Sequence, residues 1–535
     1  MGTLMGKKQR FQPPFRPAYA PSSAPPLINT EIARALVLHQ RGQLDNAEQI
    51  YRSILRAAPR NFDAVHLLGV IRCQRHQPEE GERLISQAIK INPRDASSHN
   101  NHANVLKELK RLKDALASYD RAIALKPDYA EAFNNRGNLL KELLRLDEAL
   151  ESLNKAIAIR TDFAEAHNNL ANVLELLGRS NEAVTHYVKA LSLKPSFPEA
   201  LYNLGNVFME QRKFDEARAQ YGKALSLNSN YADVHASLGW LQAELGKLDE
   251  AIATAKVADQ LSKHLSPQSH YRLGALLARC GDKEAARKHL QIYLQQDLVD
   301  SRGGRLLLAS LGFEQLPERA PDALLDLIYT RRAASWDHAR PGVYHGHALV
   351  ATCVQQLVGV SAKLDIVDAG CGTGLVGARI RHQARRLVGI DLSAAMLGKA
   401  KEKGIYDSLH QGDLVSFLAA RARSCDVVTC AATLIHFGEL RPAFEAAATA
   451  LRDGGLLVFT LFPNDDDDSV AVHPLRGMAH GGCYVHGRRY IVREAEATHF
   501  SVELLKDEIH EYQNDNPITG TIVALRRRPR ASGSE

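Results

Sequence analysis

The sequence predicts an all-α solenoid followed by an α/β domain with a doubly wound sheet, and three observations carry this prediction. The chain has 535 residues, which is more than one hydrophobic core usually serves. Its first half repeats itself with a period of 34 residues, as stacked helix pairs do. Beyond residue 320 the pattern changes to short strands that alternate with helices.

The overall composition excludes several classes of protein. Hydrophobic residues make up 45% of the chain and charged residues 24%, which excludes a collagen, a disordered polymer and a polytopic membrane protein. The net charge of +6 is small for this length, so nucleic acid binding is not implied. Seven cysteines without a CxxC pair are typical of a reducing compartment, so we expect a cytoplasmic protein without a membrane contact.

The two ends of the chain are expected to be flexible. Residues 1–27 contain six prolines and no acidic residue, so they cannot bury enough apolar surface to become ordered. A weak contact with an acidic partner is the alternative for this arm. Residues 529–535 are expected to form a basic, solubilising tail.

Ladders of equivalent positions define the repeats over residues 28–299. A proline recurs on one ladder, and alanine or glycine recurs on three others, all spaced by 34 residues. Small side chains at these spacings allow two antiparallel helices to approach closely, while the proline marks the turn to the next pair. Representative positions are Pro59, Pro93, Pro127 and Pro195, then Ala115, Ala149, Ala183 and Ala217. This pattern resembles the tetratricopeptide repeat family in about eight units, of which the last is expected to be a cap.

Asparagines occupy two columns of the repeats, three residues apart, and a third column precedes the first. Offsets of three and four place these amides on one face of the first helix of each pair. The columns resemble the peptide groove of the protein O-GlcNAc transferases, although no glycosyltransferase domain follows here. We therefore expect a protein or peptide partner to bind there, and packing between repeats is the alternative. The predicted groove residues are Asn101, Asn104, Asn135, Asn138, Asn169, Asn172, Asn203 and Asn206, with Asn100, Asn134 and Asn168 as the third column.

Residues 300–324 are expected to be a linker, because five glycines and prolines lie within them.

The α/β domain that follows contains a strand, Leu364–Asp368, that runs into a glycine-rich turn and a helix. A second strand ends in Asp391, which is placed to bind both ribose hydroxyls of a nucleoside. The turn contains Gly370, Cys371, Gly372 and Gly374.

Two cofactors use such a half-site, and three details favour S-adenosylmethionine over NAD. Counted from Gly370, the third glycine of the dinucleotide pattern is missing. Asp368 suits the positive amino group of S-adenosylmethionine and would repel a pyrophosphate. The stretch after Asp391, which includes Leu392 and Met396, resembles the class I methyltransferases. The resemblance covers residues 325–528 and implies that Asp413 and Leu414 contact the adenine.

The sequence gives fewer signals for the methyl acceptor and the catalytic residues than for the cofactor. His436 follows the fourth predicted strand and is a candidate base, with simple burial as its alternative. Ala432 stands where relatives commonly carry an acid. His480, Cys483 and His486 have the spacing of metal ligands, but the glycines among them predict a mobile loop and no metal.

The chain as a whole resembles bacterial methyltransferases fused to tetratricopeptide repeats. We expect methyl transfer from S-adenosylmethionine, with the repeats recruiting a protein partner or substrate. One alternative is a scaffold whose second domain binds a nucleoside without catalysis. A second alternative is a small-molecule methyltransferase whose repeats serve assembly, and a dehydrogenase is a third.

Overall fold

The computed structural model describes residues 26–333, 336–338, 344–359, 363–473, 483–513 and 516–529. These residues form two compact units, one up to residue 229 and one from residue 230 onward. Residues 1–25 of the predicted arm and 530–535 of the predicted tail lie outside the described residues. Among the described helices, none combines the length and the apolar character needed to cross a membrane.

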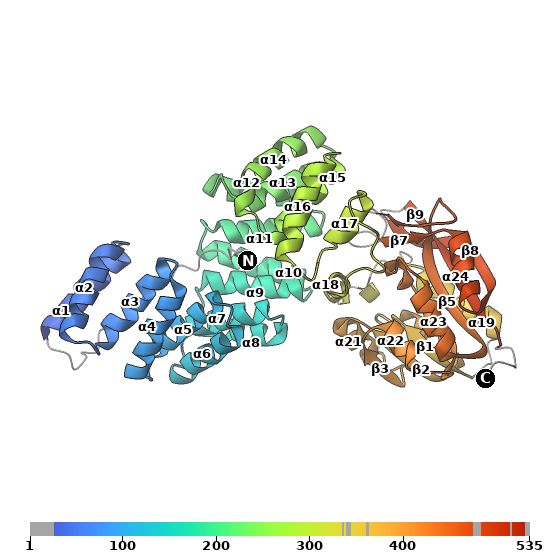
Figure 1. Cartoon of the computed structure of the whole chain (residues 1–535), viewed down its shortest axis with the longest axis horizontal. Helices are drawn as coiled ribbons and strands as arrows, with labels where there is room; N and C mark the ends of the chain where they lie inside the picture. The colour runs from blue at the N-terminus through green and yellow to red at the C-terminus, as the bar shows by residue number, and fades with distance from the viewer. Residues whose placement is uncertain are drawn as a thin grey trace. The chain divides into compact units, whose positions relative to one another are not determined.

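The described part of the first unit is a solenoid of twelve helices that pack as six consecutive pairs (Figure 1). The two helices of each pair are separated by three residues, which is enough for an antiparallel arrangement. The helices are α1 (Pro26–Gln40), α2 (Leu44–Ala57), α3 (Phe62–Gln74), α4 (Pro78–Ile91), α5 (Ala96–Glu108), α6 (Leu112–Leu125), α7 (Ala130–Glu142), α8 (Leu146–Ile159), α9 (Ala164–Leu176), α10 (Ser180–Leu193), α11 (Pro198–Glu210) and α12 (Phe214–Leu227).

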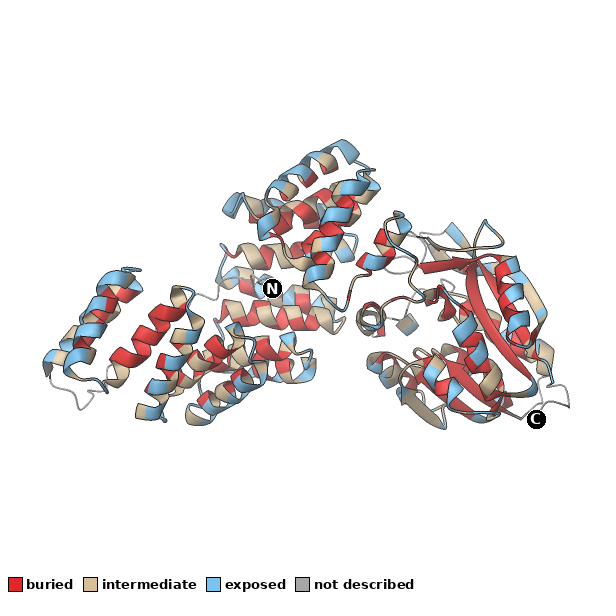
Figure 2. Cartoon of the chain, viewed as in Figure 1, coloured by how far each residue is buried: buried red, intermediate tan, exposed pale blue. Residues whose placement is uncertain are grey.

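The small-residue ladders lie where the two helices of a pair touch, as the repeat pattern predicts. Ala115, Ala149 and Ala183 are fully buried. A β-carbon added to Gly137 would lie 2.6 Å from the Leu153 Cγ, so only glycine fits at this crossing. Figure 2 shows the buried residues along the faces on which the helices meet. Overpacking such a crossing costs about 1–3 kcal/mol of folding free energy.

The second unit begins with two more helix pairs, which continue the repeat pattern. Leu273, which takes the place of a small residue in the last pair, is fully buried there. A short helix, α17 (Gly304–Ser310), follows inside the segment that the sequence predicts as a linker. The helices of the two pairs are α13 (Ala232–Glu244), α14 (Leu248–Gln260), α15 (Pro267–Arg279) and α16 (Lys283–Gln296).

The rest of the second unit is built around a mixed sheet with the strand order β3-β2-β1-β4-β5-β7-β6, and β9 pairs with β5 and β8. Strands β1 to β5 are parallel, whereas β8 and β9 form an antiparallel pair and β9 is antiparallel to β5. The strands are β1 (Leu364–Ala369), β2 (Ala384–Asp391), β3 (Ser408–Gln411), β4 (Cys425–Cys430), β5 (Leu451–Pro463), β6 (Val470–His473), β7 (Cys483–His486), β8 (Phe500–Gln513) and β9 (Asn516–Arg527).

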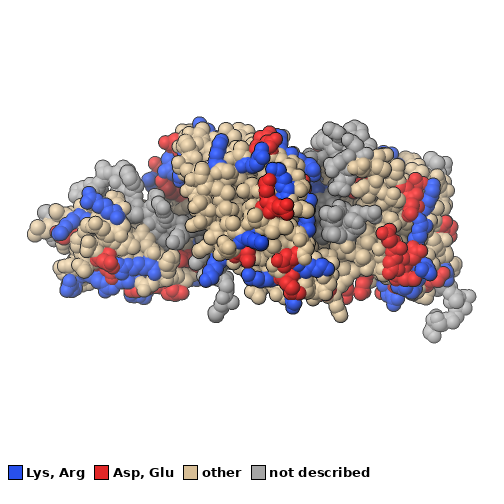
Figure 3. All heavy atoms as spheres, turned by 90° about the horizontal axis from the view of Figure 1, so that it is seen from above, with Lys and Arg blue, Asp and Glu red and all other residues tan. Residues whose placement is uncertain are grey.

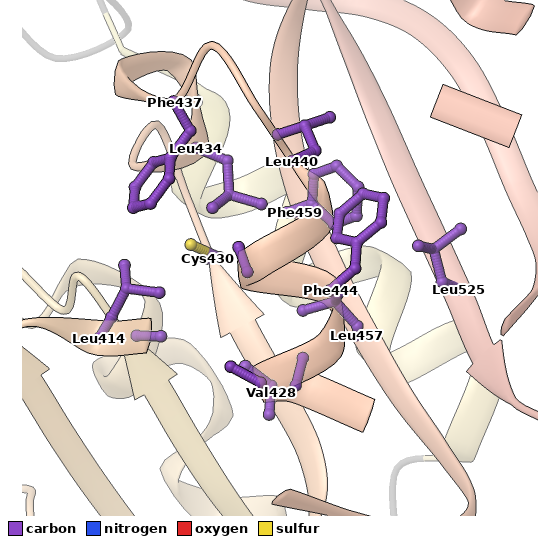
Figure 4. Close-up of a cluster of buried hydrophobic side chains, with 14 of the residues drawn as sticks. Leu414, Val428, Cys430, Leu434, Phe437, Leu440, Phe444, Leu457, Phe459 and Leu525 are labelled. Atoms are coloured by element: carbon purple, nitrogen blue, oxygen red, sulfur yellow. The ribbon is translucent and has the colours of Figure 1, made fainter. Parts of the chain in front are cut away.

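Helices cover both faces of this sheet, which makes it doubly wound. Successive strand residues belong to different hydrophobic clusters: Ile366 packs in one cluster and Val367 in the other. The larger cluster includes Phe444 and Phe459, whose rings lie 5.5 Å apart (Figure 4). Helices in this part are α18 (Asp322–Ala333), α19 (Gly346–Val358), α20 (Leu375–Ile380), α21 (Ala394–Glu402), α22 (Leu414–Ala419), α23 (Arg441–Ala450) and α24 (Arg488–Ala497).

The structure corrects the prediction of one loop and describes the predicted linker in more detail. Cys483–His486, predicted within a mobile loop, forms the buried strand β7, which pairs with the end of β5 and with β6. The predicted linker is also ordered near its end. Glu318 accepts hydrogen bonds from the backbone N–H groups of Gly438 and Glu439, and Ala320 donates one to His436. We call residues 317–321 the strap.

Charges of both signs are interspersed on the face drawn in Figure 3. Many of them form exposed ion pairs within one turn of a helix, such as Arg145 with Glu148 and Arg179 with Glu182. Exposed pairs of this kind contribute only about 0–1 kcal/mol each to stability. The hydrophobic clusters therefore hold the fold together.

Candidate functional site

A cavity opens at the carboxyl ends of strands β1 to β4, where ligands bind in doubly wound sheets. Its empty volume is about 960 Å³, counted to its open mouth. Of the ten residues predicted to bind the cofactor, the eight that line it are Gly370, Cys371, Gly372, Asp391, Leu392, Met396, Asp413 and Leu414. Asp368 and Gly374 do not line it.

The glycine turn after β1 depends on backbone conformations that favour glycine. Gly370, Gly372 and Gly374 have φ angles of +71°, +53° and +88°. A β-carbon on Gly370 would collide with the Thr433 side chain, and one on Gly374 would lie 3.0 Å from the Tyr406 ring. A β-carbon on Gly372 would meet no atom within 4 Å, because it would point into open space. Gly370 and Gly374 thus serve packing, and Gly372 leaves the backbone open to a ligand.

Asp391 ends β2 and is held by the backbone of the turn. Its carboxylate oxygens accept hydrogen bonds from the backbone N–H of Gly372 at 2.8 Å and of Ser393 at 2.9 Å. Burial raises the pKa of this carboxyl above its usual value. A carboxylate has about four acceptor positions, so two remain for hydroxyl groups of a ligand in the cavity.

Asp368 does not have the position that the sequence suggests. Its side chain is only 1% exposed, and its oxygens accept hydrogen bonds from the Tyr406 hydroxyl at 2.7 Å and the Thr429 hydroxyl at 2.8 Å. Burial raises the pKa of Asp368 to about 6. Asp368 is enclosed within the sheet and fixes the residues around the turn, and its contact with a cofactor amino group stays a prediction.

Sequence reasoning missed Arg319, which the strap places in the cavity lining. Its guanidinium donates to the Asp413 carboxylate at 2.6 Å and to Asp322 at 3.1 Å. Asp413 also caps α22 by accepting from Ser416, and these bonds hold the pKa of Asp413 below its usual value although burial opposes them. No sequence motif marks Arg319, because the contact joins positions 94 residues apart.

His436 lies on the rim of the cavity at the end of the short helix η4 (Leu434–His436). Its Nε2 atom lies 2.6 Å from the hydroxyl oxygen of Tyr329, which comes from α18. Burial lowers the pKa of His436 to about 4 and raises the pKa of Tyr329 above its usual range. His436 is thus paired inside the cavity with a second titratable group.

A second contact fixes the short helix η2 (Trp336–His338) beside the glycine turn. Asp337 accepts a hydrogen bond from the Thr373 hydroxyl at 2.5 Å and pairs with Lys403 at 2.7 Å. Thr373 lines the cavity, because it follows Gly372 in the turn. The neighbouring Trp336 lines the cavity.

The asparagine columns of the first unit lie close together, but their amides bond mainly to the protein itself. The side chains of Asn135, Asn169 and Asn203 donate to asparagines of the preceding repeat at 3.1, 2.9 and 3.2 Å. Their acceptors are the third-column residues Asn100, Asn134 and Asn168, which are buried. The other column is paired too: the buried tyrosines 119, 187 and 221 donate to Asn104, Asn172 and Asn206.

These bonds favour the alternative that the third column serves packing between repeats. Each amide at Asn100, Asn134 or Asn168 joins two neighbouring repeats, so the column is part of the packing. The Asn101 amide nitrogen donates in the same way to the Nε2 atom of His66 in the preceding repeat. Asn138 is an exception among the predicted groove residues, because Leu153 takes the place of a tyrosine opposite it.

Of the three residues with the spacing of metal ligands, His480 lies outside the described residues. Among the described residues, no group of three histidine, cysteine or acidic side chains could hold a metal ion. His486 is buried, and its Nε2 atom bonds to the Phe437 carbonyl oxygen at 2.8 Å.

Comparisons with known proteins match the helical repeats and the α/β domain to two different kinds of family model. A family model for a methyltransferase domain matches residues 367–459. Models for the TPR repeat match residues 103–143, 145–178 and 176–212, and further tetratricopeptide repeat models match residues 38–104 and 202–264.

Similar curated proteins match only a part of this chain. The ubiquinone biosynthesis O-methyltransferase of Aromatoleum aromaticum is 31% identical over 99 residues, which are 18% of this chain and 42% of that protein. The enzyme of the same name from Salmonella enteritidis is 28% identical over 166 residues, 29% of this chain and 67% of that protein. The chain thus spans about two fifths of the length of the first relative. Among solved structures, MamA is 24% identical, with a TM-score of 0.28, over 30% of this chain and 94% of MamA.

Proposed function

We propose that this chain, which combines tetratricopeptide repeats with a methyltransferase domain, transfers a methyl group from S-adenosylmethionine. We further propose that its repeats recruit a protein that is the substrate or a regulator. The repeats would occupy residues 28–299, the catalytic domain residues 325–528 and the linker residues 300–324. All seven cysteines are free thiols, and a cytoplasmic location is part of the proposal.

The observation that carries the cofactor assignment is the pairing of Gly372 and Asp391 at the cavity wall. Gly372 leaves its backbone uncovered, and the carboxylate that accepts its N–H retains acceptor positions for two ribose hydroxyls. The turn carries no phosphate-binding cation, and Asp391 brings a negative charge to it. These features fit a nucleoside with a positive sulfonium better than a dinucleotide.

When bound, S-adenosylmethionine supplies a methyl group on a positively charged sulfur. Gly372 and Asp391 would hold its ribose, while Leu392, Met396 and Leu414 would enclose its apolar surface. Asp413 is occupied by Arg319, so the adenine would meet the two residues together. Trp336, held over the turn through Asp337, would exclude water from the reacting groups.

Recruitment by the repeats rests on the fold class, since stacked helix pairs offer an extended surface to other proteins. The asparagine columns give it less support than the sequence suggested, because most of their amides bond between repeats. Two alternative functions therefore remain: a scaffold with a nucleoside-binding domain, and a small-molecule methyltransferase whose repeats serve assembly.

Isothermal titration of the full chain with S-adenosylmethionine and with NAD tests the cofactor first. Binding of S-adenosylmethionine alone is expected, and binding of NAD alone would refute the assignment. Incubation with tritiated donor and cell extract then separates the remaining functions. Label in protein supports recruitment of a substrate, label in small molecules supports the assembly alternative, and binding without any transfer supports the scaffold.

A further inference from the structure

The cavity contains one hydrogen-bonded pair of side chains suited to proton transfer. The Tyr329 hydroxyl oxygen and the His436 Nε2 atom lie 2.6 Å apart, and both residues line the cavity. Their rings meet edge to face, with centroids 5.7 Å apart. Tyr329 comes from α18 and His436 from the loop after β4, so the fold brings together residues 107 positions apart.

The direction of this hydrogen bond follows from the ionisation of both groups. Burial lowers the pKa of His436 to about 4, so the imidazole is neutral near pH 7. Burial also raises the pKa of Tyr329, so the phenol keeps its proton. The tyrosine therefore donates and Nε2 accepts, which places the ring proton of His436 on Nδ1. The hydroxyl oxygen of Tyr329 retains lone pairs that can accept a proton from another group.

The ionisable groups that act on the pair come from several elements. Arg332 of α18 acts to lower the pKa of Tyr329, whereas Asp391 of β2, Glu511 of β8 and Cys483 of β7 act to raise it. For His436, burial is the sole cause of the lowered pKa among the described residues.

The pair lies beside the proposed ribose site rather than within it. In the strand order β3-β2-β1-β4, Asp391 ends β2 and His436 follows β4, so β1 separates them. Aromatic rings continue the cavity wall around the pair. Trp336 lies 5.8 Å from Tyr329 and 6.1 Å from Tyr344 between ring centroids, and all three residues line the cavity. A flat, apolar group fits such walls.

We propose that the methyl acceptor is a hydroxyl group on an aromatic ring, and that Tyr329 receives its proton while passing its own proton to His436. This inference rests on the proposed function. The acceptor oxygen forms a bond to the methyl carbon as the carbon–sulfur bond breaks, and the electron pair of that bond stays on sulfur. The acceptor proton moves to the Tyr329 oxygen, and the tyrosine proton moves to Nε2. An aryl methyl ether, a neutral thioether and a protonated His436 result.

A weak base suits this reaction and does not suit an amine acceptor. A phenol holds its proton with a pKa of about 10, but the same proton becomes strongly acidic once the oxygen carries a methyl group. The pKa of His436, about 4, lies between these two values, so His436 can accept the proton while the oxygen–carbon bond forms. A lysine amine has a pKa of about 10.4, and its methylated product is a weak acid as well. A histidine with a pKa of about 4 could not deprotonate either of these ammonium groups.

The chemistry of the labelled product tests the acceptor class. The full chain is incubated with cell extract and S-adenosylmethionine tritiated in the methyl group, and the labelled product is divided. Hydriodic acid should release the label as volatile methyl iodide, as it does from ethers. Mild alkali, which releases methanol from methyl esters, should leave it in place. Label that resists hydriodic acid, or that leaves in alkali, would overturn the proposal.

Two variants test the roles of the pair, with Tyr329 as the catalytic residue and His436 as the positioning residue behind it. Tyr329→Phe and His436→Gln should each slow single-turnover transfer to the labelled fraction of the extract by about 100-fold. The rate of wild-type protein should be independent of pH between 6 and 9. Each variant should instead gain a rate that rises with pH, because hydroxide must then remove the proton. Tyr512→Phe is the matched control, since Tyr512 also lies beside a histidine ring, at 5.8 Å, but outside the cavity lining.

Readouts other than turnover separate this inference from the proposed function. Titration with S-adenosylmethionine should give wild-type affinity for both variants, and circular dichroism confirms their folding. Nitrogen-15 spectra of labelled histidine should show an unprotonated Nε2 at His436 in wild-type protein. A wild-type chain that does not bind S-adenosylmethionine refutes the proposed function itself. Normal cofactor binding combined with a protonated Nε2, or with unchanged rates in the two variants, refutes the role of the pair alone.

Discussion

Replacement of Asp391 by alanine is the sharpest test of the cofactor site. The carboxylate would accept two ribose hydrogen bonds, each worth about 1.5–3 kcal/mol with a charged acceptor. Their loss corresponds to about 3–6 kcal/mol, and solvent that enters the vacated space recovers part of it. We therefore expect affinity for S-adenosylmethionine to fall at least tenfold, which is about 1.4 kcal/mol.

The same substitution also removes the acceptor of two backbone N–H groups, those of Gly372 and Ser393. A loss of affinity could thus come from a loosened turn, and a matched control is required. Asp407→Ala provides it, because Asp407 accepts the Leu387 N–H of the same strand at 2.7 Å and does not line the cavity. Isothermal titration at 25 °C and thermal unfolding are measured for both. Wild-type affinity in a folded Asp391→Ala protein, or an equal loss in Asp407→Ala, would refute the ribose assignment.

Three further predictions concern the turn, a buried acid and the repeats. Gly372→Val should abolish titratable cofactor binding, because its side chain would enter the cavity and its φ of +53° is strained for valine. Since burial raises the Asp368 pKa to about 6, this group should destabilise the fold by roughly 2 kcal/mol as pH rises from 4 to 7; urea unfolding of Asp368→Asn should lack that loss. Replacement of Asn135, Asn169 and Asn203 together by alanine removes three inter-repeat hydrogen bonds. Urea unfolding should show that the free energy of unfolding falls by about 1.5–4.5 kcal/mol, and unchanged stability would contradict the role of these bonds.

The sequence predicts those parts of the fold that repeat or that obey a short local rule. The 34-residue ladders predict the helix pairs because a small residue is required at every crossing, and Gly137 against Leu153 illustrates this requirement. Strands β1 and β2 are predicted because a buried parallel strand is a continuous apolar run. Strand β7 escapes prediction, because it has only four residues and glycines precede it, while its pairing with β5 and β6 follows no short local rule.

The candidate site also contains some residues that a local pattern predicts and others that only the tertiary structure reveals. Gly372 and Asp391 lie in one local unit of strand, turn and strand, so their spacing alone brings them together. Asp368 belongs to that unit as well, yet its surroundings include Tyr406 and Thr429, which no local pattern relates to it. Arg319 reaches the cavity from a segment that precedes the sheet, and only the tertiary structure reveals it.

These long-range contacts have a consequence for the division of the chain into domains. The strap donates to and accepts from the backbone of residues 436–439, and Arg319 extends from it to Asp413. A fragment that begins at residue 320 would therefore lack part of the cavity wall, although it contains the whole segment that matches the methyltransferase family. A fragment that begins at residue 312 retains the strap and omits the repeats. Only the longer fragment can show whether the repeats matter for transfer, because in the shorter one the loss of Arg319 would be mistaken for the loss of the repeats.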